Sequence, residues 1–210
     1  MSGFGTLIKF SQYEHVLQLQ NEGLLYMSNL AYFRRIEDEE LCGDPFDGVA
    51  RVERARNTKV EMGLPDGRKI TIKEANWVLR MDFYEPERIN IFCMYALHAG
   101  SFPVQEKNFR FGDYALVLTS GQEFMNRVAS TMKTQGITQA KGDLVEYVDN
   151  DSTGKLGPFK KFKTFDYQSE WRLVCYDGPG GVRKISIGSI RDISIIIPSS
   201  EVNGIITISS

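Results

Sequence analysis

A nearly continuous apolar run, Ile-Asn-Ile-Phe-Cys-Met-Tyr-Ala-Leu, occupies residues 89–97. Strands that are covered on both faces have this pattern, because neither face needs regularly placed polar side chains. We therefore predict a central strand at residues 89–97, with the other elements arranged around it.

Short segments on both sides of this run have the alternation or apolar content of strands, and only two have a clear helical period. The first predicted helix, residues 12–22, follows Ser11 as its capping residue and ends at Gly23. The second predicted helix is residues 121–134, where an apolar side chain recurs every fourth residue. One or two further helical turns are expected at 29–35. The other predicted strands are residues 6–10, 24–27, 50–61 and 69–73 with a hairpin turn between them, 114–118, 137–140, 143–148, 170–176, 182–187, 193–197 and 205–208.

This order of elements predicts an α+β fold, a single domain over residues 1–210 with mixed, mainly antiparallel sheets and two main helices. A hydrophobic content of 42% is sufficient for a core and excludes a chain that is disordered throughout. The sequence has no internal repeat and no long linker, so nothing in it indicates a second domain.

Charge and composition limit the classes of partner that we expect. With 25 basic and 27 acidic residues the net charge is −2, which gives no global indication of nucleic acid or of an anionic membrane. No apolar stretch approaches the roughly 20 residues that span a bilayer, and the first residues lack the basic and apolar regions of a secretory signal. Three scattered cysteines are typical of a reducing compartment. We expect a cytoplasmic protein without a membrane partner.

Several common sites have no support in the sequence. There is neither a phosphate-binding P-loop nor a dinucleotide-binding glycine motif between a strand and a helix. Two histidines and distant cysteines do not suggest zinc, and the acidic residues 37–40 do not follow calcium-loop spacing, so no metal site is predicted. Cys93 lies inside the apolar run, where a free cysteine is usually a small core residue and not a nucleophile.

The first candidate segment, residues 23–33, contains Tyr26, Ser28 and Tyr32. Aromatic rings bind flat cations by stacking and cation–π attraction. The segment resembles the part of ADP-ribosyltransferases in which a glycine-led strand carries a tyrosine and a small residue, followed by a second tyrosine. This resemblance implies that Tyr26 and Tyr32 hold the nicotinamide of NAD⁺ and that Ser28 makes a polar contact. The alternative is that both tyrosines are half-buried packing residues.

The second candidate segment is Tyr-Gln-Ser-Glu-Trp-Arg at residues 167–172, entering a predicted strand. Gln-x-Glu before a strand is similar to the catalytic signature of one ADP-ribosyltransferase branch. The resemblance implies that Glu170 stabilises the positive charge that develops on the ribose as nicotinamide leaves, and that Gln168 orients the acceptor. The alternative is an edge-strand glutamate that pairs with Arg172 or with a neighbour.

The third candidate segment, residues 155–165, alternates four lysines with three phenylalanines directly before this signature. In ADP-ribosyltransferases the loop ahead of the glutamate often selects the target. A basic, aromatic loop suits a nucleic acid, since lysines hold phosphates while rings stack on bases. The residues expected to bind the acceptor are Lys160, Lys161, Phe162 and Lys163. A short strand with inward phenylalanines and solvated lysines remains an equal alternative.

The start of the chain adds to the resemblance. A strand ending Leu-Ile-Lys-Phe-Ser, an amphipathic helix and Gly23 look like the opening of DarT-type nucleic-acid ADP-ribosyltransferases. They also look like uncharacterised bacterial proteins with an Asn/Gly-Asp-Pro-Phe-Asp/Glu loop, here residues 43–47, and a late Glu-x-Arg strand. The resemblance covers about a third of the chain. Lys9 departs from it, since these enzymes commonly place His, Arg or Asn there. Lys9 would contact the ribose or a phosphate, and Arg34 or Arg35 would anchor the dinucleotide phosphates unless they are an ordinary solvated pair.

The sequence therefore predicts an NAD⁺-dependent ADP-ribosyltransferase, a bacterial or phage toxin or defence effector whose acceptor is nucleic acid ahead of protein, with an antitoxin as a further partner. Two alternatives stay open. One is a non-enzymatic binding or decoy module with the same fold, and the other is a nucleic-acid-processing enzyme that uses Asp44 and Asp47 with Mg²⁺.

Overall fold

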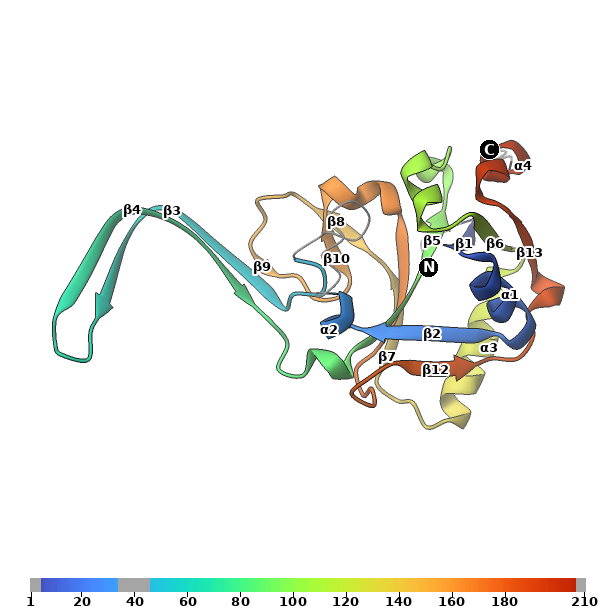
Figure 1. Ribbon diagram of the computed structural model, residues 1–210, viewed down its shortest axis with the longest axis horizontal. Helices are drawn as coiled ribbons and strands as arrows, with labels where there is room; N and C mark the ends of the chain where they lie inside the picture. The colour runs from blue at the N-terminus through green and yellow to red at the C-terminus, as the bar shows by residue number, and fades with distance from the viewer. Residues whose placement is uncertain (1–4, 34–45, 207–210) are drawn as a thin grey trace.

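The computed structural model describes residues 5–33 and 46–206. The strands of its main sheet are β1 (Thr6–Ser11), β2 (Leu24–Asn29), β5 (Asn90–Leu97), β6 (Tyr114–Leu118), β7 (Ala140–Leu144), β11 (Glu170–Cys175), β12 (Arg183–Ser186) and β13 (Ser194–Pro198). They lie in the order β12-β2-β5-β1-β6-β13, and β11 pairs with both β5 and β7 (Figure 1). All the pairs in this sheet are antiparallel, so the α+β prediction with mainly antiparallel sheets is confirmed.

β5 is the central strand that the apolar run predicts, and seven of its eight residues are buried. β11 pairs with one edge of β5 over residues 90–95. The other edge is shared, because β1 pairs with residues 95–97 whereas β2 pairs with residues 90 and 91. β1 and β2 therefore separate beside the middle of β5, and the sheet is open between them.

The two main helices, α1 (Tyr13–Glu22) and α3 (Gly121–Thr134), confirm the predicted ones. The expected cap of α1 is wrong: Ser11 is the last residue of β1, and Gln12 takes the N-cap position without a side-chain hydrogen bond. The expected end is right, since Gly23 has φ 60°, and a Cβ there would lie 2.1 Å from the carbonyl oxygen of Gly188. The short α2 (Leu30–Phe33) lies at the predicted turns.

The main core lies on one face of the sheet. Phe124, Val128 and Met132 of α3 pack there together with side chains of α1 and the central strands. The sheet residues of this core include Leu7, Leu25, Met27, Phe92, Met94, Trp171 and Leu173. Because side chains alternate along a strand, their neighbours in sequence point to the other face, which carries the candidate site.

Smaller elements complete the body. They are β8 (Glu146–Val148), β9 (Gly154–Lys155), β10 (Lys160–Phe162), α4 (Val202–Ile205) and the 3-10 turns η1 (Pro86–Arg88), η2 (Ala99–Ser101), η3 (Glu106–Phe111), η4 (Lys163–Gln168), η5 (Arg191–Ile193) and η6 (Ser199–Glu201). β10 pairs with β8 in parallel. Among the described residues no helix is both long and apolar enough to cross a membrane.

Three strand predictions need correction. The strand expected at 137–140 begins only at Ala140, after Gly136 in the left-handed region with φ 68°. The strand expected at 143–148 is divided, because Val145 makes the last backbone hydrogen bond to β11, at Glu170, and Glu146 donates its backbone N–H to Phe159 beside β10. Of the strand expected at 205–208, Ile205 is the end of helix α4, and residues 207–210 lie outside the described residues.

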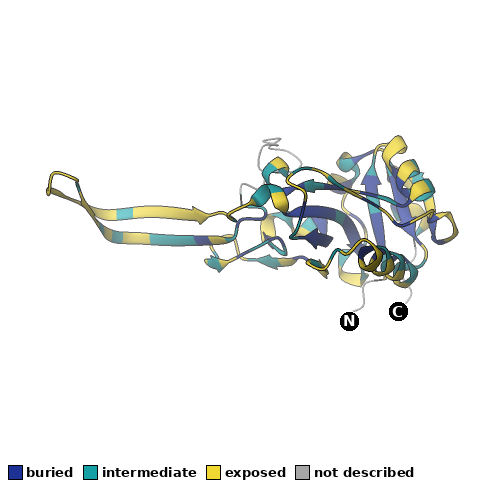
Figure 2. Cartoon of the chain, turned by 90° about the horizontal axis from the view of Figure 1, so that it is seen from below, coloured by how far each residue is buried: buried dark blue, intermediate teal, exposed yellow. Residues whose placement is uncertain are grey.

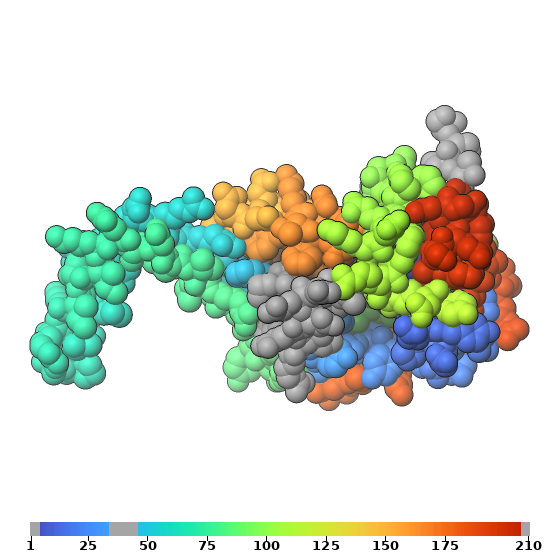
Figure 3. Space-filling view, turned by 45° about the horizontal axis from the view of Figure 1, so that its top comes forward, coloured from blue at the N-terminus to red at the C-terminus, as the bar shows by residue number. Residues whose placement is uncertain are grey.

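A long hairpin projects from the body. β3 (Arg51–Gly63) and β4 (Lys69–Met81) pair from base to tip, which confirms the hairpin prediction and extends its second strand. Only Arg51 and Val52, at the base of β3, pair with β9. Figures 1 and 3 show the hairpin reaching away from the rest of the protein with a bend midway, and Figure 2 shows that most of it is exposed. We call residues 51–81 the arm.

Candidate functional site

A cavity of about 740 Å³ lies at the opening between β1 and β2. It is lined by side chains of β1, β2, β5 and β11 and by parts of α1, α2 and β10. The cavity is lined by seven of the residues that the sequence selects: Lys9, Tyr26, Ser28, Tyr32, Lys161, Gln168 and Glu170. These residues come from both ends of the chain, so only the fold brings them together.

β2 presents Tyr26 and Ser28 to the cavity by simple alternation. Leu25 and Met27 of the same strand are buried in the main core, which turns the residues between them to the opposite face. The Tyr26 side chain is 52% exposed, and Lys184 Nζ lies 5.6 Å from its ring centroid. Tyr26 is therefore a surface of the cavity and not a core residue.

Tyr32 reaches the same cavity from α2. Its backbone N–H donates to Asn29 Oδ1 at 2.8 Å, so the buried Asn29 side chain fixes the first turn after β2. The Tyr32 ring contacts Phe33 edge to face and is 48% exposed. Both tyrosines thus offer ring surface at the cavity, as stacking on a ligand requires.

Lys9 of β1 contacts β5 at the opening of the sheet. Its Nζ donates to the backbone oxygen of Cys93 at 2.9 Å and lies 5.0 Å from the ring centroid of Phe92. Cys93 is in the middle of β5, beside which neither β1 nor β2 provides a partner residue. The Lys9 side chain thus donates to a carbonyl that, in a continuous sheet, would accept from a backbone N–H of the neighbouring strand.

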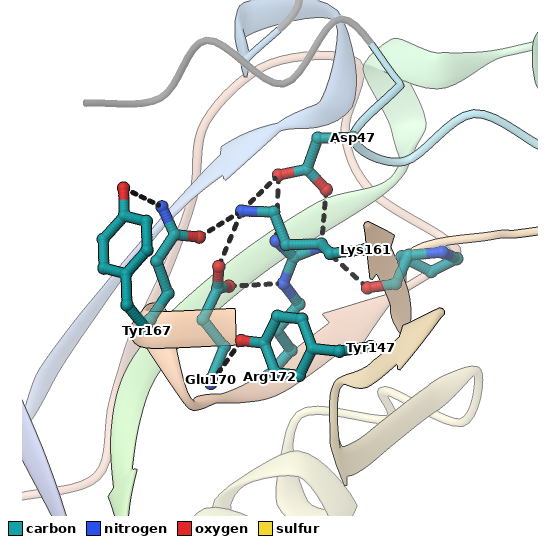
Figure 4. A network of polar contacts seen from close by, with 8 residues as sticks. Asp47, Tyr147, Lys161, Tyr167, Glu170 and Arg172 are labelled. Atoms are coloured by element: carbon teal, nitrogen blue, oxygen red, sulfur yellow. Dashed lines mark hydrogen bonds and ion pairs between the residues drawn. The ribbon is translucent and has the colours of Figure 1, made fainter. Parts of the chain in front are cut away.

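Glu170 belongs to a buried network of four charged side chains, shown in Figure 4. Its Oε1 accepts from Lys161 Nζ at 2.7 Å and its Oε2 from Arg172 Nε at 2.7 Å. Arg172 also donates to both carboxylate oxygens of Asp47, at 2.7 and 2.9 Å, while Lys161 Nζ lies 3.2 Å from Asp47 Oδ2. Two anions and two cations are thus paired, with Lys161 and Arg172 only 4% and 2% exposed.

The network keeps both carboxyl groups ionised. Burial alone would raise the pKa of Glu170, but the charges of Arg172 and Lys161 outweigh it and lower this pKa from 4.5 to about 2. The same balance holds the pKa of Asp47 well below its ordinary value. Burial opposes the charged forms of Lys161 and Arg172, yet the two carboxylates raise both of their pKa values.

The backbone around Glu170 is also held from several sides. Ser169 has a left-handed φ of 39°, and its Oγ donates to the backbone oxygen of Ala96 at 2.7 Å. The backbone N–H of Glu170 donates to the Tyr147 hydroxyl at 3.0 Å. Gln168 is buried: its Oε1 accepts from Lys161 Nζ, and its Nε2 contacts the Tyr167 hydroxyl at 3.3 Å. Gln168 therefore contacts the charge network as well as the cavity.

The basic segment before the signature is only partly a surface loop. Phe162 lies in β10, is 6% exposed and packs against Phe46, so its ring is not free to stack on a base. Lys161 is buried on Glu170, which corrects the expectation that it faces the acceptor. Lys160 pairs with Glu146 at 3.2 Å and the exposed Lys163 with Asp149 at 2.7 Å. The alternative of a short strand with inward phenylalanines describes Phe162, but Lys160, Lys161 and Lys163 are paired with acidic side chains.

One part of the alternative interpretation of Glu170 is confirmed, because Glu170 forms an ion pair with Arg172. However, β11 is not an edge strand, since it pairs with β5 and β7. Arg34, Arg35 and Asp44 lie outside the described residues.

Sequence reasoning missed the roles of Asp47 and Lys184 at the cavity, and it named Arg172 only as a partner of Glu170 in the alternative interpretation. Asp47 and Arg172 share the network with Glu170, and the Gly-Asp-Pro-Phe-Asp loop together with Glu-x-Arg was the available signal. No local pattern pointed to Lys184. Cys93 lines the cavity too, but burial, with Glu170 nearby, raises the pKa of its thiol to about 12, so the reactive thiolate is disfavoured.

The chemistry available in the cavity is thus two fixed, ionised carboxylates, two exposed tyrosine rings and several cations. Within residues 5–33 and 46–206 no three His, Cys, Asp or Glu side chains gather where they could hold a metal ion. Comparison of the chain with protein-family models, with curated proteins and with solved structures found no match.

Proposed function

We propose that the protein is an NAD⁺-dependent ADP-ribosyltransferase that transfers ADP-ribose to a macromolecule, nucleic acid ahead of protein. One observation carries the proposal: Tyr26, Tyr32 and Glu170, which lie up to 144 positions apart in the sequence, line a single cavity. A cytoplasmic toxin or defence effector, held in check by an antitoxin, is the biological setting that the resemblance implies.

In this proposal Tyr26 and Tyr32 hold the nicotinamide ring. The ring is flat and carries positive charge in NAD⁺, and an aromatic face attracts such a cation within about 6 Å. Ser28, on the same face of β2 as Tyr26, supplies a polar contact. Binding by ring faces weakens as nicotinamide leaves, because the departing ring is neutral.

Glu170 stabilises the positive charge on the ribose. The bond between the ribose carbon and the nicotinamide nitrogen breaks, and its electron pair leaves with nicotinamide. An acceptor atom then bonds to that carbon and loses its proton to solvent water. A carboxylate with a pKa of about 2 remains charged throughout this step at neutral pH. Arg172 and Lys161 each occupy one position on its oxygens, and a carboxylate has about four such positions, so others are left for a ribose hydroxyl.

Cations around the cavity suit the diphosphate. Lys9 and Lys184 line it together with Lys161 and Arg172, against the carboxylates of Asp47 and Glu170. We keep Arg34 and Arg35 as proposed phosphate ligands on the sequence argument alone. Of the residues expected to bind the acceptor, Lys160 and Lys163 remain accessible, with side chains 35% and 58% exposed.

The decisive variant is Glu170→Gln, assayed for release of nicotinamide from NAD⁺. We expect release to fall by about 10²–10³, the usual effect of removing a group that stabilises transition-state charge. Glu146→Gln is the matched control, since Glu146 pairs with Lys160 but is 63% exposed. Far-UV circular dichroism and NAD⁺ titration establish that the variant is folded and binds. Release at the parent rate by Glu170→Gln contradicts the mechanism.

A non-enzymatic binding module with this fold is the second candidate, and the pairing of both Glu170 oxygens with cations favours it. A parent protein that shows no binding on NAD⁺ titration would support this candidate. The metal-dependent alternative has less support, because the Asp47 carboxylate already accepts from Arg172 and Lys161. Divalent-metal-dependent cleavage of nucleic acid in the absence of NAD⁺ would favour it.

A further inference from the structure

The arm has one apolar and one basic face along its whole length. Opposite residues of an antiparallel pair share a face, and the pairs Met62–Ile70, Glu53–Leu79 and Arg51–Met81 extend from tip to base. Six exposed apolar side chains lie on this face, each 39–45% exposed: Met62, Ile70, Ile72, Trp77, Leu79 and Met81. An isolated hairpin is only marginally stable in water. An exposed apolar face of this length is typical of a surface that packs against another molecule.

Two bulges keep this face continuous through the bend. β3 has one extra residue between Ala55 and Thr58, and β4 has one between Ile72 and Ala75. With strict alternation, one extra residue would turn all the following side chains of that strand to the other face. In a bulge the extra residue is left unpaired, so the following side chains keep their face. Trp77 Nε1 donates to Thr58 Oγ1 at 3.2 Å, a cross-strand contact on the shared face. The apolar side chains thus stay on one face of the hairpin from Met81 at the base to Met62 near the tip.

Charge collects on the opposite face. The arm has eight basic and four acidic residues, a net charge of +4, which leaves −6 for the rest of a chain whose total is −2. By the same alternation the opposite face carries Arg54, Arg56, Lys59, Lys69, Lys73 and Arg80. Of these, Arg54 packs over the rings of Phe46 and Phe162 at the base of the arm, and the exposed Val78 lies on the same face. Nothing comparable interrupts the apolar face beyond Arg51 and Glu53, which pair with each other at the base.

We propose that the apolar face of the arm packs against the same face of a second copy of this chain, with the two arms antiparallel. The basic faces then point outward, so like charges do not meet. The antiparallel arrangement brings the tip of each +4 arm towards the −6 body of the partner. This proposal does not depend on the enzymatic one.

The area is sufficient for a specific contact. The six side chains expose on the order of 500 Å² per copy, so a pair of arms buries about 1,000 Å², the lower limit for a stable interface. A two-fold axis makes such an interface self-complementary. A nucleic acid would meet only the basic face and would leave the apolar face in water, which is why we favour a second copy.

The first test compares two double variants by sedimentation velocity over a dilution series. Ile72→Glu with Leu79→Glu places two charges on the apolar face, while Thr71→Glu with Val78→Glu places the same charges on the adjacent positions of the basic face. We expect a dimeric parent, a monomeric apolar-face variant and a dimeric basic-face variant. Far-UV circular dichroism of each variant checks the body. A parent that is monomeric throughout, or equal behaviour of the two variants, overturns the proposal.

The second test reports the orientation and uses the full-length chain. In an antiparallel pair Ala75, near the middle of the arm, lies beside its own copy, whereas Ile70, near the tip, does not. We expect Ala75→Cys to form a disulfide-linked dimer on oxidation, and neither Ile70→Cys nor the opposite-face variant Asn76→Cys to do so. Cross-linking through Ile70→Cys contradicts the antiparallel pair. A monomeric parent that shifts a DNA duplex, with the shift lost in Thr71→Glu/Val78→Glu, identifies the arm as a nucleic-acid surface instead.

Discussion

In the cavity, Lys161 and Glu170 form an ion pair with exposures of 4% and 11%, whereas Lys59 and Glu61 form the same kind of pair in the arm with exposures of 61% and 52%. The contact distances, 2.7 and 2.5 Å, are nearly equal. The surroundings differ, because the first pair is surrounded by protein and the second by water. A distance between charges thus says little about their energy until burial is known.

The two regions also place apolar side chains oppositely. The body buries its apolar residues and keeps a charged network inside, while the arm exposes an apolar face and solvates its charges. A charge network inside the body is costly unless every member is paired. An apolar face outside is costly unless it is covered, which is the basis of the proposed interface. The catalytic proposal therefore rests on the body and the assembly proposal on the arm.

The largest expected effect is on the buried network. Arg172→Met removes one of the two buried cations that Asp47 and Glu170 share and leaves the two anions with Lys161 alone, so we expect the free energy of unfolding to fall by about 3–5 kcal/mol. Lys59→Met in the arm removes an exposed partner and should cost less than about 1 kcal/mol. Urea denaturation measures both. Equal losses in the two variants would contradict the distinction between the regions.

The second-largest expected difference between the two regions is in how their stability depends on pH. The pKa of Glu170 is lowered from 4.5 to about 2, so its contribution to stability is fully present above pH 4.5 and is lost as the pH falls towards 2. The shift corresponds to about 3 kcal/mol. The pKa of Asp66 in the arm is also lowered by Arg68, but this aspartate is exposed.

Denaturation midpoints over this pH range test the contribution. The parent should lose stability on acidification, and Glu170→Gln should lose less, because the variant has no carboxylate to protonate. Asp66→Asn should follow the parent. If Glu170→Gln shows the full acid dependence of the parent, Glu170 is not the linked group.

The smallest expected effect concerns the aromatic rings. Tyr26→Ala and Tyr32→Ala should each weaken NAD⁺ binding by about 1 kcal/mol, roughly fivefold, because each removes one ring from a partly exposed site. Trp77→Ala in the arm is the control, and should leave NAD⁺ binding unchanged while weakening the dimer. Isothermal titration calorimetry and sedimentation velocity give the two readouts. Loss of NAD⁺ binding in Trp77→Ala would show that the two regions are not independent.

Local patterns predicted much of the fold. The apolar run at β5, the helical period of Phe124, Val128 and Met132 in α3, and the left-handed Gly23 are each encoded within a few residues. Predictions were wrong where non-local partners decide the outcome. β7 and β8 divide a segment that reads as one strand because their partner strands differ, and Ser11 stays in β1 because it pairs with Tyr114.

The candidate site was predictable by residue but not by arrangement. Tyr26, Ser28 and Glu170 were selected from short motifs, and all three line the cavity. The buried positions of Lys161 and Phe162 were not predicted, because a run of lysines and phenylalanines gives no indication of which side chains face inward. That choice depends on β10 pairing with β8 and packing against Phe46.

The amino-acid sequence by itself determined the strand and helix periods, the central apolar strand and the identity of the tyrosine and glutamate motifs, because these depend on neighbouring residues. Tertiary structure decided that β1 and β2 separate beside β5, that Asp47 and Glu170 share the cations Lys161 and Arg172, and that two bulges hold six exposed apolar side chains of the arm on one face. These features depend on strand pairing and burial between distant segments, and their energies exist only once the chain has folded.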